Sequence, residues 1–222
     1  MGKPKLAYWD IRGLAQKIRF ALAYMGVDYD DLTYKEDNEQ TGGDNTWASD
    51  KTKLGLIAPN LPYWIDDDVK ITESNAILKY VVRKYNPSMI PSNLAKLAEM
   101  DMIEGILADI MTYSATAAYS GEDKKEEHSY TFGSVVPTKL VILSKILGDK
   151  KFLMGNEPSY IDFPTYEILY MLTKFRPSVV QAHENLTAYM ISFEKLPAIE
   201  AYMKSPQFIK GPWFSRHCPA KI

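Results

Sequence analysis

The sequence predicts a two-part protein, in which an α/β part comes first and an all-helical part follows. Up to residue 84 the hydrophobic pattern alternates between strand and helix, in the order βαβ and then ββα. From residue 92 only helical periodicity occurs, and residues 85–91 (YNPSMIP), with two prolines, form the natural linker. We therefore expect an α/β domain over residues 1–84 and a helical domain over residues 92–222.

The α/β part begins with a strand, a helix and a second strand. Residues 5–10 (KLAYWD) have the aromatic and apolar content of a strand. Apolar residues then recur at helical spacing from Ile18 to Met25, and Gly26 supplies a C-terminal stop. Residues 27–34 form the next strand. This order favours parallel pairing of the two strands through a crossover helix.

A polar loop, a hairpin and a helix complete this part. Residues 35–50 are polar and turn-rich, and long ordered loops in compact domains are often functional. Residues 62–66 and 69–71 flank an acidic turn, which is typical of a β-hairpin. Residues 72–75 (TESN) offer N-cap side chains for a helix that continues to Val82.

The second part contains helices only. The predicted segments are 94–111, then 135–147 with a start as early as 125, then a helix after the capping-box-like residues 159–162 (SYID), and two shorter stretches near 185–194 and 197–204.

Composition and charge exclude several classes of protein. The 222 residues are 46% apolar and carry a net charge of −2, and each part is close to neutral, so no basic face for nucleic acid or anionic lipid is indicated. No apolar run approaches the roughly 18 residues of a membrane span. Cys218 is the only cysteine, so no intrachain disulfide can form and a reducing compartment is favoured. We expect a soluble cytoplasmic protein that neither binds nucleic acid nor inserts into membranes.

The familiar signatures of metal and cofactor sites are missing. Three histidines, at positions 128, 183 and 217, and one cysteine give no metal-ligand spacing. The sequence contains no GxGxxG, no phosphate-binding Gly–Lys loop and no GxSxG nucleophile elbow. We expect no metal site and no bound cofactor.

Candidate functional residues lie where predicted strands meet loops or helix starts. Taken singly, each has an ordinary structural role: Tyr8 packs in a strand, Pro62 starts one, and residues 72–74 cap a helix whose free N–H groups could also bind a carboxylate. Trp47 and Lys51 are ordinary residues of a solvated loop when considered alone.

Considered together, these residues resemble those of a known family. The matching stretches are 7–14 (AYWDIRGL), 47–51 (WASDK), 53–56 (KLGL), 59–63 (PNLPY), 70–72 (KIT), 74–77 (SNAI) and 201–205 (AYMKS). In this order and spacing they resemble the mu class of cytosolic glutathione S-transferases, and residues 102–109 resemble invertebrate members more than vertebrate ones. The resemblance implies a thioredoxin-like N-terminal domain, an all-helical domain that contributes the electrophile pocket, and a homodimer.

The resemblance also implies glutathione as a co-substrate and Tyr8 as the catalytic residue. A cysteine-like thiol with a pKa of about 8.5 is mostly protonated at pH 7. A free phenol titrates near 10, so Tyr8 is no base at that pH. Its hydroxyl can instead donate a hydrogen bond to the sulfur, which favours the thiolate and lowers the thiol pKa.

The other parts of glutathione are assigned by the same resemblance. The Leu61 backbone, presented by a cis Pro62, would bind the cysteinyl part. Ser74 would bind the γ-glutamyl carboxylate, Glu73 would lie beside the amine, and Asp109 would reach that amine from the other subunit.

The remaining family contacts concern the glycine end and the wall of the site. Trp47 and Lys51 would bind the glycine carboxylate, with Asn60 adjacent, and Trp9 and Leu14 would form the wall.

The sequence departs from the family pattern at two positions. Glu73 stands where the family usually has Gln, and Asp44 stands where the mu class has Arg, which removes one cation from the glycine end. Tyr119 matches a tyrosine that faces the electrophile, and its small neighbours at 116–118 predict a wide pocket. The glycine pair 42–43 predicts a mobile loop or simply a turn.

The leading hypothesis is therefore conjugation of the glutathione thiolate to small hydrophobic electrophiles, with Tyr8 stabilising the thiolate. Two alternatives stay open at this point. One is a ligandin that sequesters apolar compounds with little or no turnover, and the other is a glutathione-dependent isomerase.

Overall fold

The computed structural model describes residues 2–36, 46–120 and 125–220, which fall into two compact units. The first unit contains the residues up to Pro87 together with Ala201–Arg216. The second contains Ser88–Glu200 and the residues from His217 onward. The return of Ala201–Arg216 to the first unit is a feature that the helical pattern of the sequence does not reveal.

The first unit is built on a four-stranded sheet with the order β2-β1-β3-β4. Strand β1 (Lys5–Trp9) pairs in parallel with β2 (Asp30–Tyr34), and helix α1 (Gln16–Tyr24) makes the crossover between them. Strands β3 (Tyr63–Ile65) and β4 (Lys70–Thr72) form the antiparallel hairpin, and β3 also pairs antiparallel with β1. The predicted thioredoxin-like βαβ–ββα order is thus confirmed.

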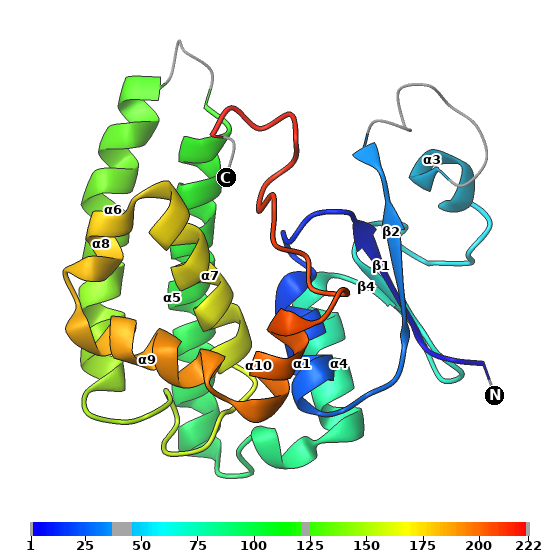
Figure 1. The fold of residues 1–222 in the computed structure, drawn as a ribbon, viewed down its shortest axis with the longest axis horizontal. Coiled ribbons are helices and arrows are strands. Elements are labelled where there is room, and N and C mark those ends of the chain that lie inside the picture. Colours follow the sequence, from blue (N-terminus) through cyan, green and yellow to red (C-terminus); the bar gives the residue numbers. More distant parts are fainter. Residues whose placement is uncertain (1, 37–45, 121–124, 221–222) are drawn as a thin grey trace. The chain divides into compact units, whose positions relative to one another are not determined.

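The core of this unit lies between the sheet and two helices. Helix α4 (Ser74–Tyr85) packs against α1, and both lie beside the sheet in Figure 1. Leu6 and Ala7 on the central strand are fully buried, as are Ile18 of α1 and Val81 of α4. Neighbouring residues of a strand point to opposite faces of the sheet. Because both faces of β1 are covered, neither set of residues needs to be polar, which explains the apolar run in this strand.

A buried carboxylate fixes the β3–β4 hairpin. The Asp66 side chain is 3% exposed and accepts hydrogen bonds from Trp64 Nε1 (2.9 Å), the Tyr80 hydroxyl (3.0 Å) and Lys84 Nζ (2.9 Å). Two backbone N–H groups of the turn also donate to it. Burial favours the neutral acid, but these hydrogen bonds, led by that of Lys84, outweigh burial and hold the Asp66 pKa well below its usual range.

The second unit is a bundle of helices. They are α5 (Leu94–Ala118), α6 (Lys125–Leu147), α7 (Asp162–Phe175), α8 (Pro177–Gln181), α9 (Glu184–Glu194) and the start of α10 (Pro197–Lys204), with a short 3-10 turn at Pro87–Met89 before them. Helices α5 and α6 lie side by side and antiparallel (Figure 1). Ten of the fourteen residues of α7 are buried, as expected for the central helix of a bundle.

The capping-box-like sequence before α7 does not form a capping box, because the N-cap residue of the helix is Ile161, which makes no side-chain cap. Asp162 is fully buried, and its Oδ2 accepts from the backbone N–H and the hydroxyl of Ser159, both at 2.8 Å. Its Oδ1 accepts from the Leu153 N–H and from the Tyr189 hydroxyl, both at 3.1 Å. The Asp162 carboxylate instead joins the start of α7 to Ser159, to the Leu153 backbone and to Tyr189 of α9.

Three local features differ from the sequence-based expectations. A four-residue helix, α3 (Trp47–Asp50), lies in the polar loop, and α8 was also not expected. Residues 72–75 do not cap α4 as predicted: among the described contacts of that helix start, the N-cap residue Glu73 makes no side-chain cap, and the Thr72 hydroxyl donates to the Ala58 carbonyl instead (2.9 Å).

The described ranges hold neither a membrane-spanning helix nor a cluster of metal-binding side chains. Within residues 2–36, 46–120 and 125–220, no helix is both long enough and apolar enough to cross a bilayer. In the same part of the chain, no group of three or more His, Cys, Asp or Glu side chains is placed to bind a metal ion.

Candidate functional site

Tyr8 lies at the centre of an apolar cluster in the first unit. Its side chain is 7% exposed near the end of β1 and packs in one cluster with Leu61 and Tyr63, against which Trp9 and Trp47 also pack. The structure thus brings together four of the predicted site residues, Tyr8, Trp9, Trp47 and Leu61, from a strand, a helix and a loop.

Helix α3 is held on the sheet by aromatic contacts and hydrogen bonds. The Trp47 ring stacks on Tyr63, with centroids 6.0 Å apart and an interplanar angle of 29°, and meets the edge of Tyr34 at 5.9 Å. The Tyr34 hydroxyl donates to Asp50 Oδ2 (3.0 Å) and lies 3.3 Å from the Tyr63 hydroxyl, which must then act as the donor to it. Burial above all, and also the hydrogen bond that Tyr34 donates to the Asp50 carboxylate, raise the pKa of Tyr34. Lys51, exposed, follows directly after α3.

The Leu61–Pro62 segment has the geometry that the resemblance implies. The peptide bond between the two residues is cis. The Leu61 N–H donates to Asn60 Oδ1 (2.9 Å), and Asn60 Nδ2 donates to Glu73 Oε1 (3.3 Å). One side-chain amide therefore occupies both the Leu61 N–H and the Glu73 carboxylate, which are two of the groups assigned to glutathione.

Glu73 has an unusual backbone. Its φ is +68° and its ψ is 110°, and it is the one non-glycine residue with positive φ in the described part of the chain. Such conformations cost on the order of 1–3 kcal/mol and tend to occur at functional sites. Ser74, directly after it, is the first residue of α4, so both side chains lie at the positive end of the helix dipole.

Leu14, Asp109 and Tyr119 also lie outside the apolar cluster. Leu14 is 39% exposed in the loop before α1. Asp109 and Tyr119 belong to the second unit, in α5 and at its C-cap. The Asp109 carboxylate forms an ion pair with Lys139 Nζ of α6 (2.6 Å), and Tyr119 is 49% exposed. Asp44 and the glycine pair 42–43 lie outside the described residues.

Sequence reasoning missed Tyr34 and Asp50, which hold α3 in place. Tyr34 ends a strand, and its partner lies 16 residues away in a polar loop. No periodicity connects the two positions, so the sequence offers no signal for this contact.

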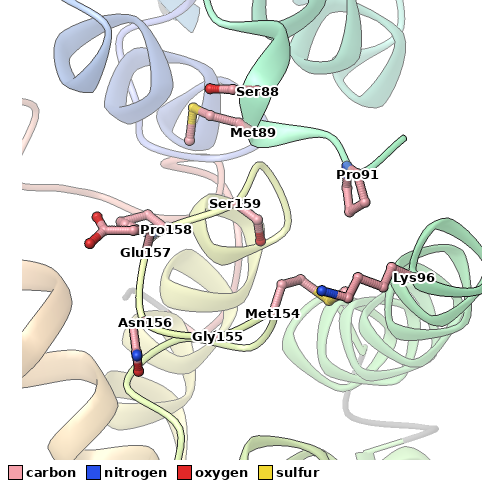
Figure 2. A pocket seen from close by; sticks show the side chains of 10 residues that line it. All are labelled: Ser88, Met89, Pro91, Lys96, Met154, Gly155, Asn156, Glu157, Pro158 and Ser159. Carbon is pink, nitrogen blue, oxygen red and sulfur yellow. The ribbon is translucent and has the colours of Figure 1, made fainter. Parts of the chain in front are cut away.

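A separate hollow lies in the second unit (Figure 2). It measures about 360 Å³ and is lined by residues that include Met89, Lys96, Met154, Glu157 and Ser159. Lys96 reaches from the first turn of α5 to the side of Met154. None of the predicted site residues lines this hollow.

Comparisons with known proteins agree with this architecture. Residues 4–83 match the family model of the glutathione S-transferase N-terminal domain, and residues 108–206 match that of the C-terminal domain. Among solved structures, the glutathione S-transferase Blo t 8 superposes with a TM-score of 0.85 at 28% identity, covering 98% of this chain and 100% of that one. Rat hPGDS complexed with a quinoline shares the fold, with a TM-score of 0.78 at 24% identity over 94% of this chain and 100% of that one.

Relatives in sequence cover nearly the whole chain. Glutathione S-transferase 2 of Gallus gallus is 38% identical over 94% of this chain and 93% of its own length. Glutathione S-transferase Mu 2 of Mus musculus is 38% identical over 95% of both chains, and the class-mu 26 kDa isozyme 7 of Fasciola hepatica is 36% identical over 97% and 94%. Since vertebrate and invertebrate relatives match about equally, the expected closeness to invertebrate members stays a prediction. This chain belongs to the glutathione S-transferase family, and its relatives include the mu class.

Proposed function

We propose that this protein conjugates the thiolate of glutathione to small hydrophobic electrophiles, with the Tyr8 hydroxyl stabilising the thiolate. The observation that carries the proposal is the position of Tyr8, buried near the end of β1 in one cluster with Trp47 and Leu61. In the reaction the thiol proton leaves to solvent, the sulfur electron pair forms a bond to the electrophilic carbon, and the leaving group departs with its bonding electrons.

The free energy by which Tyr8 would have to stabilise the thiolate is modest. Lowering the thiol pKa by two units corresponds to about 2.7 kcal/mol and raises the thiolate fraction at pH 7 roughly twenty-fold. One hydrogen bond to a charged acceptor contributes about 1.5–3 kcal/mol. A single phenol hydroxyl near the positive N-terminal end of α1 is therefore sufficient in principle.

Glutathione binding would replace hydrogen bonds that the protein already makes. The cysteinyl part would take the Leu61 N–H from Asn60, and the γ-glutamyl amine would take the Glu73 carboxylate from the same side chain. Because Asn60 is exposed, its amide turns to water at little cost. Ser74 would bind the γ-glutamyl carboxylate, and Trp47 and Lys51 would bind the glycine end.

We further propose a cytoplasmic homodimer. Its support is the family role of Asp109, which reaches the γ-glutamyl amine of the other subunit and would have to share its carboxylate with Lys139. Tyr119 would face the electrophile.

Replacement of Tyr8 by Phe tests the proposed mechanism. Tyr8→Phe keeps the ring and removes the hydroxyl, so we expect glutathione affinity within about threefold of wild type, kcat lower by roughly twenty-fold at pH 7, and a raised pKa of the bound thiol. Tyr80→Phe, which removes a hydroxyl from the hairpin anchor of the same unit, is the matched control and should keep normal turnover. Normal turnover of Tyr8→Phe at neutral pH would refute the role of Tyr8. Failure of the wild type to bind glutathione resin and to conjugate an aryl halide would favour a ligandin.

A further inference from the structure

The Tyr8 hydroxyl lies directly against the backbone of Gly13. A methyl carbon built at Gly13 would be 2.7 Å from Tyr8 Oη and 2.8 Å from Tyr8 Cε1. Carbon atoms essentially never come that close, and Gly13 also has a φ of +39°, which favours glycine. The absence of a side chain at position 13 therefore sets how far the loop can approach the phenol.

This loop is fastened by the chain's own C-terminal segment. The Arg12 and Gly13 N–H groups donate to the Pro212 and Trp213 carbonyls at 2.9 and 3.0 Å. We call residues 209–216 the C-terminal brace. These two hydrogen bonds join residues that are about 200 positions apart, and they hold the backbone that faces the Tyr8 hydroxyl.

A buried arginine fixes the beginning of the brace. Arg12 is fully buried, its Nη1 donates to the Ile209 carbonyl (3.0 Å), and its guanidinium lies 5.0 Å from the centre of the Phe208 ring. Trp213 and Phe214 are also buried and meet edge to face at 4.7 Å. The brace is thus anchored in the unit at Ile209 and at the buried pair Trp213 and Phe214.

An ion pair fixes the other end. Arg216 Nη2 lies 2.7 Å from Asp10 Oδ2, and the Arg216 N–H donates to Glu36 Oε2 (2.8 Å). Asp10 and Gly13 both belong to the loop of residues 10–15 that follows β1, so the brace contacts this loop at its first residue and near its middle.

We propose that Gly13 and the C-terminal brace are positioning elements for the Tyr8 hydroxyl, and that they set the pKa of the bound thiol without touching glutathione. The proposal deepens the proposed function and rests on its assignment of Tyr8. The physical reason is that a hydrogen-bond donor stabilises a developing or resident anion only within a few tenths of an ångström of its best position. A loop held at Asp10 and at Gly13 keeps the phenol there, and a loosened loop does not.

Two glycines of the same backbone class provide a matched test. Gly13→Ala and Gly26→Ala both place a side chain at positive φ, but the added carbon at Gly26, where φ is +66°, meets no atom within 4 Å. Backbone strain is therefore common to both variants, and the contact with Tyr8 is specific to one. The measurement is the pH profile of kcat/KM between pH 5.5 and 9, from which the pKa of the bound thiol is read.

We expect the apparent thiol pKa to rise by about one unit in Gly13→Ala, with an approximately fivefold loss of kcat/KM at pH 6.5 that disappears toward pH 9. Gly26→Ala should keep the wild-type pKa. A purely structural role of Gly13 would lower the amount of active enzyme equally at every pH. Equal profiles of the two variants would therefore overturn the proposal.

Arg216→Ala is the second variant and decides the matter should Gly13→Ala fail to fold. It loosens the end of the brace at a half-exposed side chain. In the same pH profile we expect the apparent thiol pKa to rise by about half a unit, which is roughly threefold in the acid dissociation constant of the thiol. Lys210→Ala, which removes an exposed cation from the same segment, is its control. An unshifted Arg216→Ala overturns the role of the brace. If Tyr8→Phe leaves the pH profile unchanged, the proposed mechanism fails and this inference fails with it. If Tyr8→Phe shifts the thiol pKa but Gly13→Ala and Arg216→Ala do not, only the inference is refuted.

Discussion

Removing the hydroxyl of Tyr34 should weaken glutathione binding without slowing the chemical step. Tyr34→Phe keeps the ring that packs between Trp9 and Trp47 but breaks the hydrogen bond to Asp50 and the contact with the Tyr63 hydroxyl. The hydrogen bond to Asp50 joins α3 to the sheet, and the contact with Tyr63 joins the end of β2 to β3, on whose Tyr63 ring Trp47 of α3 stacks. Since α3 carries Trp47 and ends just before Lys51, its loosening acts on the glycine end of the ligand.

The size of the effect follows from the two hydrogen bonds. A bond to a charged acceptor contributes about 1.5–3 kcal/mol and one between neutral groups about 0.5–1.5 kcal/mol. Asp50 is only half-buried and Ser49 also donates to it, so water can replace part of what is lost. We expect a net loss of about 1–2 kcal/mol, which is roughly a five- to thirtyfold weaker affinity for glutathione.

Titration calorimetry with glutathione, together with steady-state kinetics at saturating electrophile, measures this effect. The KM for glutathione should rise with the dissociation constant, and kcat at saturating glutathione should stay within about twofold of wild type. Tyr63→Phe removes one of the two interactions and leaves the Tyr34–Asp50 bond, so it should give a smaller loss. An unchanged affinity in Tyr34→Phe, or a fall in kcat at constant KM, would contradict the reasoning.

Three further predictions concern stability and the subunit contact. The folded-state pKa of Asp66 is depressed, so its stabilising effect is complete above the unfolded value of about 3.9 and is lost as the pH falls below it. Asp66→Asn should therefore lower the free energy of unfolding by about 2 kcal/mol at pH 7 and by less at pH 3. Stability curves of wild type and variant that run parallel between these pH values would argue against this. Asp162→Ala leaves buried donors, including the Ser159 N–H, without an acceptor, and should cost about 3–5 kcal/mol in urea unfolding; a cost below about 1 kcal/mol would contradict the role of this anchor. Lys139→Met frees the Asp109 carboxylate and should lower the KM for glutathione by about two- to fivefold, whereas a raised KM would show that the ion pair positions Asp109 for its ligand.

The order of elements in the first unit was predictable because each has a pattern of its own. Residues 5–10 and 27–34 contain the β1 and β2 strands, and the helical spacing from Ile18 to Met25 matches α1 to within two residues at each end. The four-residue helix α3 has too few residues for any periodicity. It forms because Trp47 stacks on Tyr63, a tertiary contact.

The contacts that hold the loop beside Tyr8 were not predictable for a related reason. Its contacts join residues that are distant in sequence, such as Arg12 and Ile209, which are 197 positions apart. Family motifs point to Tyr8, Trp47 and Pro62, whose contacts with a ligand stay a prediction. Backbone hydrogen bonds such as the one between Gly13 and Trp213 depend little on side-chain identity, so no motif records them.

Glu73 shows how stability and ligand recognition can oppose one another at a single position. Glycine adopts a φ of +68° without strain, so selection for stability alone would favour glycine there. Glycine, however, has no carboxylate to offer an ammonium group. Consensus or library approaches that rank variants only by melting temperature would therefore tend to remove the carboxylate that we propose binds the glutathione amine at the start of α4. On that proposal, stabilised forms of this protein should be selected with glutathione present.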